Sequence, residues 1–231
     1  GARPRAARGR RAGPPPAGDP EHEGRALNAR IGLLDYGSGN LHSAARAFAN
    51  AGADVAVTAD LAELRRMDAL VVPGVGAFAA CMRGLRAAGG VELIREWVGL
   101  GRPLFGICVG HQVLFEGGTE HGERADGVGL FDGLVEPLAA RRLPHMGWNL
   151  VDAPEESRLF AGLAGERFYF VHSYAALAGP ADALTATARH EGATFVAAVE
   201  RGAVASTQFH PEKSGAAGAR LIANWISTLI R

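Results

Sequence analysis

The sequence predicts an α/β fold in which a mostly parallel open sheet carries helices on both faces. Between Arg30 and Cys108, short apolar runs that end at glycine-rich turns alternate with segments whose apolar residues recur at helical spacing. Such strand–helix–strand units make right-handed crossovers between parallel strands. In the C-terminal half, strand patterns follow one another with little helix between them. This change predicts an antiparallel extension of the sheet or a mixed sheet.

The first half contains alternating strand and helix patterns. Each expected strand is an apolar or β-branched run, and the first expected helix repeats Leu41, Ala45, Phe48 and Ala51 on one face. The expected strands are 31–35, 54–58, 69–72 and 103–107, and the expected helices are 41–51, 61–67, 78–88 and 91–99.

The second half contributes five further strand patterns and a final helix. The final helix carries a single apolar stripe, which is typical of a helix that faces a core. The strands are expected at 134–139, 168–174, 185–190, 194–200 and 203–210, and the helix at about 216–230.

Composition limits the class of protein. The chain has 231 residues, of which 48% are hydrophobic, and it carries 24 basic and 24 acidic side chains. These values fit one large domain, expected over 30–231, and argue against nucleic acid or an anionic membrane as the main partner. The two cysteines, Cys81 and Cys108, are too few for a disulfide framework, so we expect a reducing, cytoplasmic location. Cys81 falls within the expected helix 78–88, and we expect it to lie away from the glycine-rich loops. No apolar run approaches the ~20 residues that a membrane-spanning helix needs.

Residues 1–29 differ from the rest of the chain. They are rich in Arg, Ala, Gly and Pro, show no apolar periodicity, and lack the apolar middle of a secretory signal. We therefore expect a disordered tail, with an RNA-binding arm as the alternative.

The segment "GICVG" (106–110) indicates a nucleophile. Ligands of open α/β sheets bind beyond the carboxyl ends of the strands, where this segment, "YGSGN" (36–40) and "PGVG" (73–76) all fall. The pattern G-x-C-x-G is the cysteine form of the nucleophile elbow, and a helix N-terminus stabilises a thiolate. The alternative is that Cys108 is simply a small buried apolar residue.

The segment "QFHPE" (208–212) supplies a base for such a nucleophile. His210 and Glu212 are two residues apart, so on an extended segment their side chains point to the same side. A nucleophilic thiol needs a base, and the base needs an orienting carboxylate. The backbone N–H of Val109 and that of Val75 or Gly76 are candidate donors of an oxyanion hole.

Several segments then resemble a known family. "GICVGHQ" and "FHPEKS" are similar to the two signature segments of the class I glutamine amidotransferases, whose triad is Cys, His and Glu. Within that family the chain resembles the glutaminase subunits of imidazole glycerol phosphate synthases. Four stretches carry this likeness over about 30–231: "DYGSGNL", "PGVGAF", "PHMGWN" and "YFVHSY". The resemblance implies a flavodoxin-like, class I glutaminase fold.

The resemblance also implies an activity and its residues. Cys108 would attack glutamine, His210 would transfer protons, and Glu212 would orient the imidazole, with no cofactor or metal ion. The substrate would be bound by Gly76, Gln112, His172, Ser173 and Tyr174, with Glu120 near its ammonium group. The partner would be a (β/α)₈ synthase (cyclase) subunit in a heterodimer, which uses the ammonia to form imidazole glycerol phosphate and aminoimidazole carboxamide ribotide. Met146 and Trp148, expected in a loop, would lie either in that interface or in the core.

Three other functions stay open at this point. His111 stands where this subfamily more often has methionine, which favours the alternative of a glutaminase component of another class I enzyme such as anthranilate synthase. A catalytically silent binding protein is disfavoured by Cys108, His210 and Glu212 together. A nucleotide-binding protein would rest only on Gly37 and Gly39, which is a weak phosphate signal.

Overall fold

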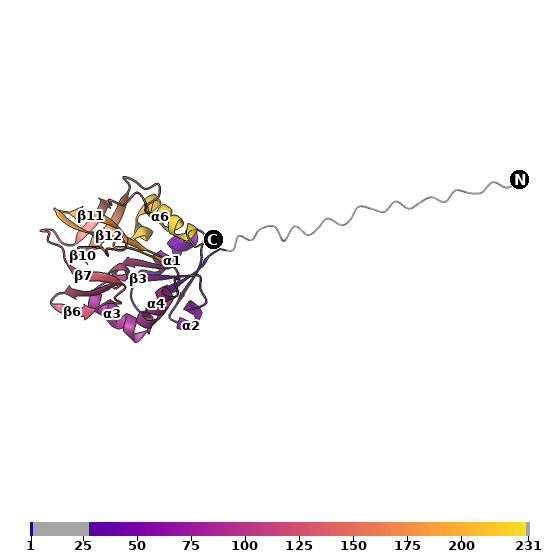
Figure 1. Cartoon of the computed structure of the whole chain (residues 1–231), viewed down its shortest axis with the longest axis horizontal. Helices are drawn as coiled ribbons and strands as arrows, with labels where there is room; N and C mark the ends of the chain where they lie inside the picture. Colours follow the sequence, from indigo (N-terminus) through magenta and orange to yellow (C-terminus); the bar gives the residue numbers. More distant parts are fainter. Residues whose placement is uncertain (2–27, 230–231) are drawn as a thin grey trace.

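A seven-stranded sheet forms the centre of the molecule (Figure 1). The computed structural model describes residue 1 and residues 28–229. The strand order is β11-β12-β13-β4-β3-β1-β2, in which β2, β1, β3, β4 and β13 pair in parallel and β12 and β11 are antiparallel. The strands are β1 (Arg30–Leu34), β2 (Asp54–Thr58), β3 (Ala69–Gly74), β4 (Leu104–Cys108), β11 (Leu184–His190), β12 (Ala193–Arg201) and β13 (Val204–Thr207). The predicted fold class is confirmed.

Helices cover both faces of this sheet. On one face Phe105 of β4 packs between α1 and α6, with its ring centroid 5.9 Å from that of Phe48 and 5.1 Å from that of Trp225. On the other face Gly32 of β1 lies against Leu64 and Met67. Figure 1 shows α1 and α6 on one side and α2, α3 and α4 on the other. The helices are α1 (Leu41–Asn50), α2 (Leu61–Leu64), α3 (Phe78–Ala87), α4 (Gly90–Gly99), α5 (Val109–Gln112) and α6 (Gly215–Ser227).

Two smaller sheets were not predicted from the sequence. One has the order β10-β7-β5-β6 and the other is the hairpin β8–β9. Their strands are β5 (Phe115–Glu120), β6 (Glu123–Asp126), β7 (Phe131–Pro137), β8 (His145–Leu150), β9 (Arg167–His172) and β10 (Tyr174–Ala176). The single strand expected at 168–174 is therefore wrong, because Ser173 divides it between two sheets. The loop expected at "PHMGWN" is also wrong, because most of it forms β8, whose six residues all pair with β9.

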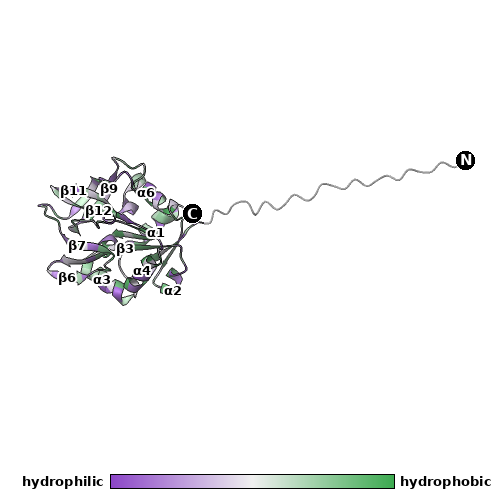
Figure 2. Ribbon diagram, in the orientation of Figure 1, coloured by the Kyte–Doolittle hydropathy of each residue, from purple (hydrophilic) through white to green (hydrophobic). Residues whose placement is uncertain are grey.

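Some predicted boundaries also shift. Most of the tail prediction, residues 2–27, lies outside the described residues. Ala29, expected in the tail, is buried and its carbonyl accepts a hydrogen bond from Asp54 N (3.0 Å), so the packed body begins before Arg30. Figure 2 shows β3 coloured hydrophobic, in accord with its six buried residues. Within 28–229, no helix combines the length and apolar character needed to cross a bilayer.

Candidate active site

Cys108 ends β4 in a strained turn. Its φ is 56° and its ψ is −112°, in a region that residues with a side chain rarely adopt. Glycines make the turn possible, because a Cβ on Gly110 would lie 1.8 Å from Val72 O and a Cβ on Gly106 would lie 2.8 Å from Gly110 O. Such strain costs of the order of 1–3 kcal/mol and is typical of a functional position. The geometry is that of a nucleophile elbow.

The predicted base and carboxylate are paired. His210 Nδ1 lies 2.7 Å from Glu212 Oε1, and both side chains are only 2% exposed. The expectation that both side chains lie on an extended segment is wrong for Glu212. It lies on a 3-10 helix, η2 (Pro211–Lys213), whose N-cap is His210. Because Nδ1 donates its proton to Glu212, Nε2 is the ring atom that can exchange a proton with a reacting group.

The surroundings of His210 favour its charged form. Burial lowers the pKa of His210, but the neighbouring Cys108 sulfur and the Glu212 carboxylate raise it, with a net value of about 9. At neutral pH the imidazole is therefore protonated and places a positive charge beside the Cys108 sulfur. His210 Nε2 has no hydrogen-bond partner among the described residues, so it is available to a substrate.

A cavity of about 600 Å³ brings the predicted site residues together. It is lined by both Cys108 and His210, with Glu212 behind His210. The remaining predicted residues also line it, namely Val75, Gly76, Val109, Gln112, Glu120, His172, Ser173 and Tyr174. Sequence reasoning did not single out His121, Leu143, Val171 and Lys213, which complete the wall.

The candidate oxyanion donors are not equivalent. The backbone N–H of Val75 donates to Ser38 Oγ (3.2 Å), and the same hydroxyl donates to Val75 O (2.8 Å). By contrast, the N–H groups of Gly76 and Val109 make no hydrogen bond with the residues described. In this state Val109 and Gly76 can bind an oxyanion, whereas Val75 N–H is engaged elsewhere.

Cys81 lies closer to this loop than the sequence indicated. A helical position away from the loops was expected, and Cys81 is indeed on α3. Its sulfur, however, lies 3.3 Å from Val75 O and 3.2 Å from Ser38 Oγ. Cys81 therefore contacts the loop that carries the candidate oxyanion donors, and its isolation from the site was a wrong expectation.

Hydrogen bonds hold the amide and carboxylate side chains around the rest of the cavity in place. Gln112 Nε2 donates to Tyr174 O (2.8 Å) and to Gln208 Oε1 (3.0 Å), so Gln112 presents only its oxygen to a ligand. Gln208 was not predicted, although it lies in the quoted "QFHPE" segment, and its Nε2 is 3.9 Å from Cys108 Sγ. Glu120 Oε2 accepts from Phe78 N (2.6 Å), which ties Glu120 to the first turn of α3.

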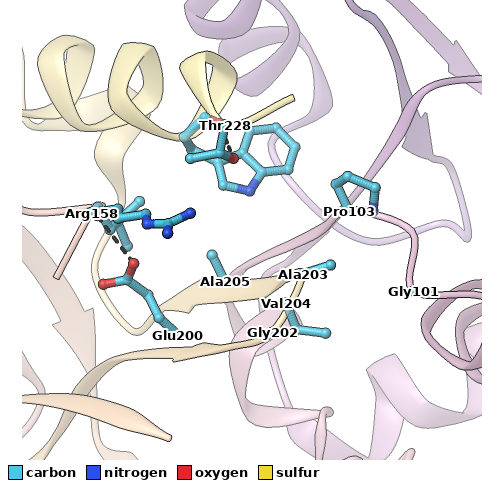
Figure 3. A pocket seen from close by; sticks show the side chains of 11 residues that line it. Gly101, Pro103, Arg158, Glu200, Gly202, Ala203, Val204, Ala205 and Thr228 are labelled. Carbon is cyan, nitrogen blue, oxygen red and sulfur yellow. Dashed lines mark hydrogen bonds between the residues drawn. The ribbon is translucent and has the colours of Figure 1, made fainter. Parts of the chain in front are cut away.

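A second cavity, shown in Figure 3, lies at the amino-terminal ends of β4 and β13. Its volume is about 340 Å³, and it is lined by residues that precede β4 and β13, such as Pro103 and Ala203. Glu200 in its wall accepts hydrogen bonds from Ser157 Oγ and from Leu159 N. Among the described residues no cysteine or histidine lines it, whereas Cys108 and His210, the predicted nucleophile and base, line the larger cavity.

Comparison with known proteins agrees with this geometry. Residues 32–228 match the family Glutamine amidotransferase class-I, and the chain belongs to this family. The chain is 58% identical over 201 residues to the imidazole glycerol phosphate synthase subunit HisH of Cutibacterium acnes, covering 87% of this chain and 97% of that protein. It is 55% identical over 209 residues to the HisH subunit of Leifsonia xyli subsp. xyli, covering 88% and 100%.

A solved structure described as a glutamine amidotransferase shares the fold. It superposes with a TM-score of 0.67 at 21% identity and covers 85% of this chain and 98% of that one. The protein is thus a glutamine amidotransferase of the HisH type. The alternative of an anthranilate synthase component has no support among these relatives.

Proposed function

We propose that the protein is the glutaminase subunit of imidazole glycerol phosphate synthase and that Cys108, His210 and Glu212 hydrolyse glutamine. One observation carries the assignment of residues. The buried His210–Glu212 pair, 2.7 Å apart, lies at the same cavity as the strained Cys108. The HisH relatives support the choice of synthase.

The reaction follows from the positions of these groups. The Cys108 thiolate attacks the side-chain amide carbon of glutamine, and the oxyanion is held by the N–H groups of Val109 and Gly76 and, once it leaves Ser38 Oγ, by that of Val75. His210 Nε2–H protonates the departing ammonia, which leaves a glutamyl thioester on Cys108. His210 then takes a proton from water, and the hydroxide releases glutamate. Glu212 keeps Nδ1–H in place throughout.

The ammonia requires a partner. In neutral water most of it becomes ammonium, which is not a nucleophile. We therefore infer that a (β/α)₈ cyclase subunit docks over the cavity to form a heterodimer, receives the ammonia directly and makes imidazole glycerol phosphate. A cytoplasmic location belongs to the same proposal, because Cys81 and Cys108 are both free thiols, as is usual in a reducing compartment.

The test compares synthesis from glutamine with synthesis from free ammonium, so that loss of glutamine hydrolysis is distinguished from loss of the synthase reaction. In a complex with the cyclase subunit, Cys108→Ala is expected to abolish synthesis from glutamine while ammonium salts still support it. His210→Ala should cost nearly as much, and Glu212→Gln less, because the imidazole is then present but poorly oriented. Cys108→Ala that still uses glutamine, or a parent complex that uses chorismate as the acceptor, would contradict the proposal.

A further inference from the structure

A chain of hydrogen bonds connects the β8–β9 hairpin to the cavity. Asn149 Nδ2 lies 3.2 Å from His145 Nε2, and His145 Nδ1 lies 3.1 Å from His172 Nε2. His172 Nδ1 in turn lies 3.0 Å from Tyr174 O. His145 and His172 are direct partners in the register of the hairpin, which explains why their rings meet.

The chemistry of these groups fixes the direction of every bond. Burial lowers the pKa of His172 to about 3 and that of His145 to about 4, where the nearby His190 also contributes, so both rings are neutral at pH 7. A carbonyl oxygen only accepts, so His172 carries its proton on Nδ1 and accepts at Nε2. His145 must then donate from Nδ1 and accept at Nε2.

Asn149 completes the chain at its outer end. Its amide Nδ2 donates one hydrogen to His145 Nε2 and the other to Arg189 O (2.8 Å). Its Oδ1 accepts from Leu150 N (2.8 Å), so the orientation of the amide is determined by its neighbours on both sides. Each polar atom of this hydrogen-bond chain therefore has one possible role, as a donor or as an acceptor.

The inner end of this hydrogen-bond chain reaches the part of the cavity wall formed by residues 172–174. Tyr174 O accepts from His172 and also from Gln112 Nε2 (2.8 Å), and Gln112 follows the nucleophile on α5. His172, Ser173 and Tyr174 all line the cavity. The same carbonyl thus joins the wall formed by 172–174 to the helix that begins after Cys108.

We propose that His145 and Asn149 are positioning residues for glutamine: they hold His172 in one neutral tautomer and so fix the wall 172–174 against Gln112. The proposal rests on the proposed function for the identity of the substrate. Neither residue lines the cavity, so both act through His172. A purely structural role is the competing explanation, because the His145 ring also stacks on His190, with centroids 4.3 Å apart.

Asn149→Asp separates these explanations, because it keeps the size of the side chain and replaces a donor by an acceptor. The new carboxylate only accepts hydrogen bonds, so His145 Nε2 must carry a proton in order to bind it. If His145 stays neutral, Nδ1 loses its proton, His172 must donate from Nε2, and a lone pair of His172 then faces Tyr174 O. If His145 becomes charged instead, its Nδ1–H is kept and the ring carries a proton that the parent lacks.

The experiment uses the full chain with Cys108→Ala, so that glutamine binds without turnover. Titration with glutamine gives the Kd, and the ring ¹⁵N shifts report the tautomers of His145 and His172. In Asn149→Asp we expect altered ring protonation and glutamine binding about tenfold weaker, the effect of one displaced hydrogen bond. Asn224→Asp on α6 is the matched control, because it removes amide donors to Leu159 O and Ala161 O and should leave the Kd unchanged.

Unchanged affinity in a folded Asn149→Asp protein would overturn the proposal, whatever the tautomers do. If that variant does not fold, Asn149→Ala removes the donor without adding charge and is expected to weaken glutamine binding to a smaller degree; unchanged binding there overturns it equally. Failure of the proposed function would look different from failure of this proposal. The parent would then bind no glutamine, although the tautomers of His145 and His172 would still match the hydrogen-bond chain.

Discussion

At Cys108 the backbone is strained and the side chain is almost fully buried, yet the residue is a poor candidate for a purely structural thiol. A buried apolar role would not need φ = 56°, nor a buried His210–Glu212 pair beside it. The local pattern G-x-C-x-G allowed Cys108 to be predicted as the nucleophile, and "FHPE" allowed the pair to be predicted. The engaged N–H of Val75 and the role of Gln208 could not be predicted, because they depend on contacts between residues 37 and 100 positions apart.

The pKa of His210 provides a prediction at this scale. It is raised from 6.5 to about 9 partly by Cys108, so Cys108→Ala should lower it, since alanine carries no charge. A raised folded pKa gives stability that is fully present below about pH 6.5 and is lost as the pH rises through about 9. The decline in unfolding free energy over this range should therefore be smaller in Cys108→Ala.

NMR titration of His210 in the full chain measures the pKa, and denaturant unfolding at several pH values measures the stability. Cys81→Ala is the control, because Cys81 is not among the groups that shift the pKa of His210. Equal His210 pKa values in the parent and in Cys108→Ala would show that the thiolate does not act on the ring.

Ser38 provides a second prediction for single residues. Its hydroxyl accepts from the N–H of Val75 and donates to the carbonyl of Val75, so it keeps that N–H from a developing oxyanion. Ser38→Ala should raise the glutaminase rate of the isolated chain by about five- to tenfold, because a net hydrogen bond of ~1 kcal/mol no longer opposes the rearrangement. Ser227→Ala, which removes a local bond to Asn224 O on α6, should have no effect.

A rate that falls or stays constant in Ser38→Ala would mean that Val75 N–H is not an oxyanion donor. Cys81→Ala should act in the same direction as Ser38→Ala but more weakly, because a thiol is a poorer donor to Val75 O.

At the scale of elements, glycines decide how closely α5 approaches the sheet. A Cβ at Gly110 would lie 1.8 Å from Val72 O, which is backbone and cannot move aside without displacing β3. Gly110→Ala should therefore destabilise the protein by about 3 kcal/mol or more, the scale of severe strain in a core. Gly99→Ala, in α4 with no atom within 4 Å of its Cβ, should instead stabilise by about 0.5–1 kcal/mol.

Thermal or denaturant unfolding of the two variants beside the parent checks this prediction. Similar stability changes for Gly110→Ala and Gly99→Ala would show that the elbow relaxes without cost.

The elements that sequence patterns missed share a physical cause. The central parallel strands β3 and β4 are buried on both faces, so they appear as continuous apolar runs such as "ALVV". β5 reads "FEGGTE", and its glycines are required by packing, since a Cβ at Gly118 would lie 3.0 Å from the Phe78 ring. β8 contains Gly147 at φ = 130°. Such strands are stabilised by their tertiary partners rather than by intrinsic preference.

At the scale of the whole molecule, the active-site edge carries an exposed apolar strip. Met146, Trp148 and Leu150 alternate along β8 with exposures of 62%, 51% and 47%, so the core location considered for Met146 and Trp148 is wrong. Trp148 lies beside Gly215, just after the η2 segment that holds Glu212. Ser214 Oγ also joins β9 to His210, accepting from Tyr169 N (2.9 Å) and donating to His210 O (2.6 Å).

This arrangement leads to the prediction for the heterodimer. Exposed aromatic residues at the centre of an interface often contribute 2 kcal/mol or more, so Trp148→Ala should weaken binding of the cyclase subunit by about 30-fold. The isolated chain should show little glutaminase activity, and the partner with its nucleotide should raise that activity by orders of magnitude, because losing one oxyanion donor costs ~10²–10³ in rate. In Trp148→Ala the stimulation should need correspondingly more partner, while glutamine binding is unchanged.

Leu100→Ala is the matched control. Leu100 is 67% exposed but precedes β4, at the edge of the sheet opposite Cys108. Calorimetric titration with the cyclase subunit, and glutaminase rates at increasing partner concentration, should show the parent and Leu100→Ala as equals. If Leu100→Ala weakened binding as much as Trp148→Ala did, β8 would not be the docking surface. If the isolated chain were already fully active, a partner docked on β8 above the cavity would not be needed to activate the glutaminase.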